Sequence, residues 1–175
     1  MSHRVFVFGT LKRGFPNHDV LGSEPCFVSE ASTVASYPLY VTGRWYSPVV
    51  VDEPGSGYPI SGELYDVDDE TLARLDRLES VGEPGGYRRL TISVKRGAQR
   101  EHASIYVKDR ADIEVIHSEE RGTYLDGRYL HRRDRMLNGT EVVKDIAYHA
   151  HEPMSYEDVT ARIDSTRPTD HVRGY

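Results

Sequence analysis

Strand-like segments follow one another through most of this chain with one clear helix between them, and this order restricts the possible folds. Residues 4–8, 26–41 and 45–67 are rich in β-branched and aromatic residues, with turn-forming Pro and Gly between the runs. Parallel strands need a crossover, usually a helix, between each pair, and the pattern lacks such helices. The sequence therefore predicts an α+β domain built on a small, mostly antiparallel, barrel-like sheet with a few short helices.

The second half of the chain continues this pattern. Residues 87–97 and 101–110 alternate as two strands, and Arg-Gly-Ala-Gln between them predicts a hairpin. Residues 141–151 indicate a further strand, and a capping box begins a short predicted helix at residues 155–163.

Length and charge indicate one globular domain. A chain of 175 residues has room for a hydrophobic core. We expect the domain to cover residues 1–139, with residues 140–175 as a C-terminal extension packed on it or trailing from it. The net charge of −6 argues against nucleic acid as the main partner.

We expect a cytoplasmic protein. The N-terminus has neither the long apolar stretch nor the cleavage site of a signal peptide, and no segment approaches the roughly 20 apolar residues of a membrane helix. Cys26 is the single cysteine, so the chain cannot form an internal disulfide, as fits a reducing compartment. For Cys26 we favour a packed small side chain over a reactive thiol.

The clearest helix is predicted over residues 68–80. Because successive residues of an α-helix are turned by about 100°, Glu79 projects between Leu72 and Leu75, inside the apolar stripe that should face the core. Burial and the negative end of the helix dipole should both raise the pKa of Glu79, which suits a group that transfers protons. The alternative is that the helix frays and Glu79 reaches water or Arg88.

The loop after the first strand, residues 9–14, can bind an anion. Gly9, Thr10 and Leu11 can present successive backbone N–H groups to one point, and such nests bind carboxylate or phosphate. The spacing is neither that of a P-loop nor that of a dinucleotide fingerprint. Taken alone, the loop also fits an ordinary turn. His18, at the end of this region, either borders a pocket or caps its backbone neighbours.

Together these segments resemble the gamma-glutamylcyclotransferase-like superfamily, above all its gamma-glutamylamine cyclotransferase branch. The resemblance covers residues 4–107 and depends on Gly-Thr-Leu-Lys…Pro-Asn-His, Gly-Glu-Leu-Tyr-Asp-Val-Asp and Leu-Asp-Arg-Leu-Glu-Ser…Tyr-Arg-Arg, in this order. It implies a barrel-like α+β fold and a cyclising acyltransferase of C–N-lyase type that uses no metal or cofactor. In this reaction the α-amine of a gamma-glutamyl group attacks its own γ-carbonyl and releases 5-oxoproline with an amine or amino acid.

Positions that match the family define the expected site. The resemblance implies that Glu79 is the catalytic acid/base. For Asp76, which lies beside Glu79 on the predicted helix, the residues themselves leave two roles open: it shares a proton with Glu79 or, as we favour, it has a supporting or solvent-facing role. The following residues are expected to bind the substrate, the first three through its α-carboxylate: Gly9, Thr10, Leu11, Tyr87 and Tyr106. The expected partner is a small gamma-glutamyl molecule, with no metal, nucleic acid or membrane, and the protein should be a monomer or weak homodimer.

One departure leaves the function open. Many relatives have tyrosine where this chain has Phe8. The alternatives are a cyclotransferase for gamma-glutamyl amines, one for gamma-glutamyl amino acids, and a non-catalytic small-ligand or protein-binding module. An acidic pocket mouth would suit cationic amines, and a basic one a leaving amino acid. His149 and His151 alternate on a possible strand, but without a third ligand they fit solvent-facing histidines better than a metal site.

Overall fold

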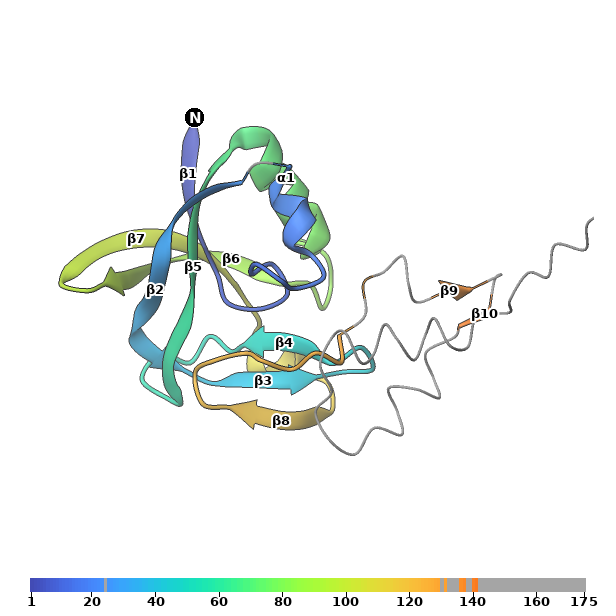
Figure 1. Ribbon diagram of the computed structural model, residues 1–175. Helices are drawn as coiled ribbons and strands as arrows, with labels where there is room; N and C mark the ends of the chain where they lie inside the picture. Colours follow the sequence, from blue (N-terminus) through green and yellow to red (C-terminus); the bar gives the residue numbers. More distant parts are fainter. Residues whose placement is uncertain (24, 130, 132–135, 138–139, 142–175) are drawn as a thin grey trace, which may run out of the picture.

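The protein is built around a closed five-stranded barrel, seen in a computed structural model that describes residues 1–23, 25–129, 131, 136–137 and 140–141 (Figure 1). The barrel order is β1–β5–β2–β6–β7. Its strands are β1 (Ser2–Val7), β2 (Cys26–Tyr37), β5 (Tyr58–Asp68), β6 (Arg88–Arg96) and β7 (Gln99–Val107). Neighbouring strands are antiparallel except β1 and β7, which close the barrel in parallel. The predicted α+β fold on a mostly antiparallel, barrel-like sheet is confirmed.

A second sheet lies below the barrel in the view of Figure 1, with its strands in the order β4–β3–β8. These strands are β3 (Leu39–Thr42), β4 (Ser47–Val50) and β8 (Ile116–Glu120). The other elements are helix α1 (Asp69–Leu78), the 3-10 helices η1 (His18–Leu21) and η2 (Arg110–Asp112), and the two-residue strands β9 (Met136–Leu137) and β10 (Thr140–Glu141).

The predicted elements agree with this arrangement in the part of the chain that the structure describes. Pro38 separates β2 from β3, and a turn at Gly97 joins β6 to β7 as the predicted hairpin. The predicted helix begins at its aspartate cap, but it ends at Leu78 rather than at residue 80. The predicted helix at 155–163 lies outside the described residues. The same holds for most of the C-terminal extension and for all but the first residue of the strand expected at 141–151. The proposed domain boundary therefore stays a prediction.

Strand β1 is buried on both faces, and this explains why its apolar run does not alternate. Phe6 belongs to the large cluster of buried side chains that includes Leu64 and extends to the second sheet. Val5 and Val7 instead pack with Leu75 of α1 in a second cluster. Helices α1 and η1 lie side by side over this outer face of the barrel (Figure 1).

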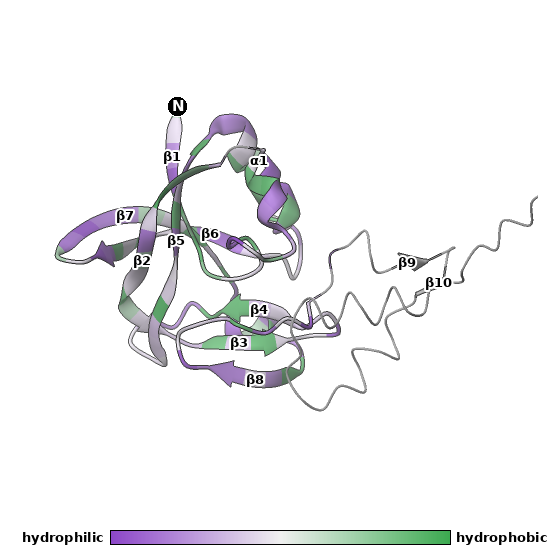
Figure 2. Cartoon of the chain, viewed as in Figure 1, coloured by the Kyte–Doolittle hydropathy of each residue, from purple (hydrophilic) through white to green (hydrophobic). Residues whose placement is uncertain are grey.

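The second sheet has a hydrophobic centre and a hydrophilic edge. Figure 2 shows β3 and β4 as largely hydrophobic and β8 as mostly hydrophilic. Leu39 and Val41 of the central strand β3 are fully buried, whereas Ile116 at the start of β8 is exposed. Among the described residues, no helix is long and apolar enough to cross a bilayer.

The prediction that Cys26 is packed in the core is wrong. Its side chain is exposed. Cys26 is the first residue of β2 and lies opposite Asp66 close to the end of β5, where the ladder reaches solvent. The next side chain, Phe27, is exposed as well.

We predict that Leu75→Ala destabilises the whole fold. Leu75 is 0% exposed and joins α1 to the barrel, so removing its side chain leaves a cavity between the two. The expected cost is about 2–5 kcal/mol in the free energy of unfolding, measured by urea denaturation. Leu125→Ala, at a side chain that is 73% exposed, is the control and should change it little. Equal losses in both variants would contradict this account.

We also predict that stability falls at alkaline pH through Tyr65. Burial raises the pKa of Tyr65, and the hydrogen bond that its hydroxyl donates to Glu63 at 2.8 Å raises it further. Above about pH 10 the unfolded chain loses the tyrosine proton that the folded chain keeps, so the free energy of unfolding decreases as pH rises. Urea denaturation at increasing pH should show a shallower decrease for Tyr65→Phe than for the wild type or for Tyr58→Phe, which changes an exposed tyrosine.

Candidate active site

One cavity of about 400 Å³ brings the predicted site residues together. Its wall includes the loop after β1, the segment after α1 and the end of β7. All six residues that the sequence singles out line it: Gly9, Thr10, Leu11, Glu79, Tyr87 and Tyr106. Residues far apart in the chain thus share one space, while their roles in binding and catalysis stay predictions.

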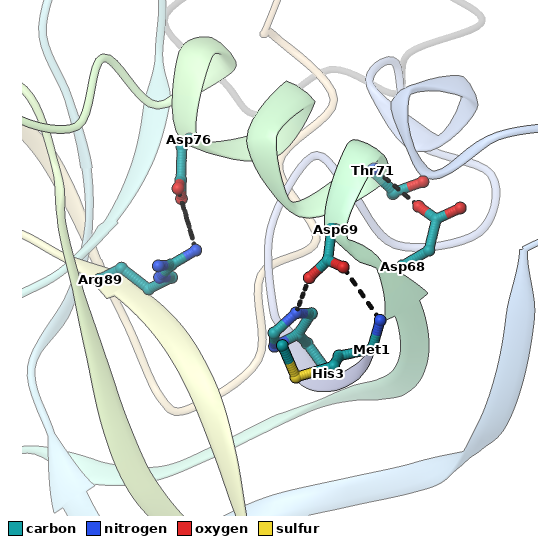
Figure 3. Close-up of polar contacts among 7 residues, drawn as sticks. All are labelled: Met1, His3, Asp68, Asp69, Thr71, Asp76 and Arg89. Atoms are coloured by element: carbon teal, nitrogen blue, oxygen red, sulfur yellow. Dashed lines mark hydrogen bonds and ion pairs between the residues drawn. The ribbon is translucent and has the colours of Figure 1, made fainter.

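Helix α1 runs in the same direction as β1, which explains why the two ends meet at this cavity. Strand β5 runs antiparallel to β1 and leads directly into α1, so the helix returns alongside β1. At the start of both elements, Asp69 pairs with His3 at 2.7 Å and with the amino group of Met1 at 2.9 Å (Figure 3). The opposite ends therefore place the loop at Gly9 and the carboxylate of Glu79 on the same side of the barrel.

Three consecutive N–H groups of the loop after β1 lack an acceptor among the described residues. The Gly9 carbonyl accepts a hydrogen bond from Lys12 N–H at 3.1 Å, and the Thr10 carbonyl accepts one from Asn17 N–H at 2.9 Å. The Leu11 carbonyl accepts one from His18 Nδ1 at 2.9 Å. Within the described chain, the N–H groups of the same three residues donate to no other protein atom. The loop therefore has the donor arrangement expected of an anion-binding nest, and His18 caps its backbone.

Two buried side chains hold this loop in place. Asn17 lines the cavity, and its Nδ2 donates to Thr10 Oγ1 at 2.9 Å and to the Tyr129 hydroxyl at 3.2 Å. Lys12 Nζ donates to the Tyr124 carbonyl at 2.7 Å, and burial lowers the pKa of this lysine. The sequence argument gave Asn17 no role, because a Pro-Asn pair is an ordinary turn signal and the distant partners are not visible in the sequence.

Glu79 comes directly after the last residue of α1. Its N–H donates to the Leu75 carbonyl at 3.0 Å, so the backbone keeps the helical path to this point. The chain then turns at Ser80, which has a φ of 54°, and comes back so that Tyr87 N–H donates to the Glu79 carbonyl at 2.9 Å. The turn needs glycine at Gly86, because a Cβ there would lie 2.0 Å from the Ser80 carbonyl oxygen.

The side chain of Glu79 is half-buried in the cavity wall. Arg88, which the sequence suggested as an alternative partner for Glu79, forms ion pairs with Asp52 and Asp109. The helix position predicted from the 3.6-residue period therefore leads to the cavity, although the helix itself is shorter than expected.

Both predicted tyrosines donate their hydroxyl hydrogens to the protein. The Tyr106 hydroxyl donates to Asp76 Oδ1 at 2.8 Å, and the Tyr87 hydroxyl donates to the Pro48 carbonyl at 3.1 Å. Burial raises the pKa of both hydroxyls well above the usual value for tyrosine, so both stay protonated at neutral pH. Asp76 also pairs with Arg89 at 2.9 Å (Figure 3). Its contacts with Tyr106 and Arg89 fit the supporting role that we favour for it.

The inner wall and the rim of the cavity differ in character. Phe8 is buried and lines the cavity, so this position gives an apolar surface. Two exposed carboxylates, Glu83 and Glu114, lie in the lining together with Lys108. The Lys108 ammonium is engaged by the Gly85 carbonyl at 2.7 Å. The lining thus has more carboxylates than ammonium groups.

Among the residues that the structure describes, no group of three or more His, Cys, Asp or Glu side chains is arranged to hold a metal ion. His149 and His151 lie outside the described residues, so the expectation for them stays untested.

Comparisons with known proteins agree with the fold. The family model described as gamma-glutamyl cyclotransferase, AIG2-like, matches residues 5–131. A gamma-glutamylaminecyclotransferase C of Danio rerio is 36% identical over 117 residues, which are 61% of this chain and 76% of that protein. A gamma-glutamylaminecyclotransferase of Rattus norvegicus is 39% identical over 99 residues, or 54% of this chain and 64% of that protein.

A crystal structure of an AIG2-like protein from Mus musculus superposes with a TM-score of 0.57 at 32% identity, covering 61% of this chain and 77% of that one. The match of the family model includes the loop after β1, the segment after α1 and the end of β7, and all three contribute to the cavity wall. The chain therefore belongs to the gamma-glutamyl cyclotransferase, AIG2-like family.

Proposed function

We propose that this protein is a gamma-glutamylamine cyclotransferase that releases 5-oxoproline from a gamma-glutamyl amine without a metal or cofactor. The observation that carries the proposal is the shared cavity, in which Glu79 and the unoccupied N–H groups of Gly9, Thr10 and Leu11 line one space. The names of the similar fish and rat proteins support the same reaction class.

The loop binds the α-carboxylate of the substrate. Three consecutive N–H groups without a protein acceptor suit an anion, because hydrogen bonds to a charged group are stronger than those between neutral groups. With the α-carboxylate held there, the gamma-glutamyl chain extends across the cavity toward Glu79, and its amine and γ-carbonyl are held close together. Such positioning alone makes a large contribution to forming a five-membered ring.

Glu79 moves the protons. The α-ammonium first gives one proton to Glu79, and the free amine nitrogen then forms a bond to the γ-carbonyl carbon. The bond between this carbon and the amide nitrogen breaks, and the leaving nitrogen takes the proton from Glu79. A second proton follows the same route, so the products are 5-oxoproline and a protonated amine, and Glu79 returns to its starting state.

The charge of the rim favours a cationic leaving amine. Glu83 and Glu114 are exposed at the cavity and attract a positively charged group, whereas Lys108 is held by a backbone carbonyl. A leaving group with its own carboxylate would be repelled by the same rim. Phe8 removes a hydroxyl from the inner wall and leaves apolar contact in its place.

The setting that we propose is the cytoplasm, where the protein acts as a monomer or weak homodimer on a small gamma-glutamyl molecule. The single cysteine and the net charge of −6 support a reducing compartment and a partner other than nucleic acid.

We predict that Glu79→Gln abolishes release of 5-oxoproline. Glutamine keeps the size of the side chain but cannot take up the proton, so kcat should fall by about a hundredfold or more. The measurement is 5-oxoproline by mass spectrometry after incubation with a panel of gamma-glutamyl amines and gamma-glutamyl amino acids. Glu70→Gln, the same change on the exposed face of α1, is the control. Equal product from Glu79→Gln and wild type would remove Glu79 from its role, and no product from folded wild type would favour the non-catalytic binding module.

We also predict that Glu83→Gln and Glu114→Gln together reduce the preference for a cationic leaving amine. Both carboxylates are exposed, so the expected change in kcat/KM is small, roughly two- to fivefold for the cationic substrate. A substrate of similar length that releases a neutral amine provides the comparison and should be unaffected. Added salt should reduce the difference between wild type and the double variant. An equal loss on both substrates would argue against charge selection at the rim.

A further inference from the structure

Tyr106 lines the cavity, and its hydroxyl hydrogen is already engaged by the protein. A tyrosine hydroxyl has one hydrogen to donate and lone pairs to accept. In Tyr106 the hydrogen is directed at Asp76 Oδ1, 2.8 Å away. The side chain of Arg89 also contacts this hydroxyl, and a lone pair that remains on the oxygen suits an N–H group and not a carboxylate.

Asp76 is itself held in one orientation. Arg89 Nη1 lies 3.0 Å from Asp76 Oδ1 and 2.9 Å from Oδ2, so one guanidinium nitrogen contacts both carboxylate oxygens (Figure 3). Arg89 on β6 is the cross-strand partner of Tyr106 on β7. The guanidinium, the carboxylate and the hydroxyl therefore form one connected group across α1, β6 and β7.

This group lies beside Glu79. Asp76 and Glu79 are three residues apart, and side chains at this spacing are neighbours on a helix. The backbone is helical up to the N–H of Glu79, which donates to Leu75, so the spacing applies here. Tyr106 and Glu79 both line the cavity. A substrate group in this part of the cavity can therefore lie close to both Tyr106 and Glu79.

We propose that Asp76, oriented by Arg89, is a positioning residue that fixes the Tyr106 hydroxyl as an acceptor for the α-ammonium of the substrate. This inference rests on the proposed cyclotransferase function. The substrate offers N–H donors at its α-ammonium and at its γ-amide, and the ammonium is the one that must approach Glu79 before the ring forms. If Asp76 did not take the hydroxyl hydrogen, that hydrogen could turn toward the cavity and oppose the ammonium.

The arrangement selects for a free amine on the substrate. A glutaryl amide has the same carboxylate, chain and amide as a gamma-glutamyl amine, but it has hydrogen in place of the α-ammonium. Tyr106 should contribute to binding and turnover of the gamma-glutamyl amine and make no difference to the glutaryl amide, which acts as a competitive inhibitor.

The test compares kcat/KM for a gamma-glutamyl amine with Ki for the matching glutaryl amide in the full-length protein. Tyr106→Phe should lower kcat/KM by roughly tenfold or more, the effect of losing a hydrogen bond to a charged group, and leave Ki unchanged. Asp76→Asn should lower kcat/KM by a smaller factor and also leave Ki unchanged. The double variant should be no worse than Tyr106→Phe alone, because Asp76 acts through the Tyr106 hydroxyl.

Asp69→Asn is the matched control, since it removes a paired carboxylate from the same helix at the end away from the cavity (Figure 3). A rise in Ki that parallels the loss of kcat/KM would mean a damaged cavity and would overturn the inference, as would full activity of Tyr106→Phe. If Asp76→Asn does not fold, the isosteric Tyr106→Phe variant decides the question. Wild type that binds the glutaryl amide but releases no 5-oxoproline would refute the proposed function, and this inference with it.

Discussion

The burial of β1 on both faces is the constraint on which the rest of the structure depends. One face contributes Phe6 to the large core cluster, and the other needs a cover for Val5 and Val7. Helix α1 supplies that cover through Leu75 and runs in the same direction as β1, because β5 reverses the chain between them. A packing requirement far from any chemistry thus brings the end of a strand and the end of a helix to one cavity, and the N–H groups and the carboxylate of the site come from those two ends.

The polar groups of the cavity divide into donors and acceptors. Backbone hydrogen bonds occupy the carbonyls of the first loop and leave its N–H groups as donors. Tyr87 and Tyr106, which also line the cavity, give their hydroxyl hydrogens to Pro48 and Asp76 and so do not donate to a ligand. This division fits the gamma-glutamyl substrate that we propose, which carries a carboxylate and a protonated amine close together. Rigid backbone and ion pairs fix this division before a ligand arrives, which lowers the ordering cost of binding.

Sequence patterns predicted those parts of the structure that depend on local rules. Alternation and turn residues located the strands, and the helical period located α1 and the face on which Glu79 lies. Each of these features follows from residues that are close together in the sequence. Cys26 was misplaced because its exposure depends on where β2 meets the end of β5, which no local pattern records. Asn17 was overlooked for the same reason, since its partner Tyr129 is distant in sequence. The pairing of Asp76 with Arg89 and Tyr106 likewise requires the register of β6 and β7.

The parallel contact that closes the barrel has a consequence for the order of folding. Val5 meets Ser104, and Lys12 reaches the carbonyl of Tyr124, so the first loop is secured by segments made much later. Contacts of this separation carry a large loop-closure entropy and form after the local hairpins. On the ribosome, β1 must therefore wait, apolar on both faces, until the later strands emerge. Val5, Phe6 and Val7 are then an apolar part of the nascent chain that stays exposed for longest, although the folded molecule buries them.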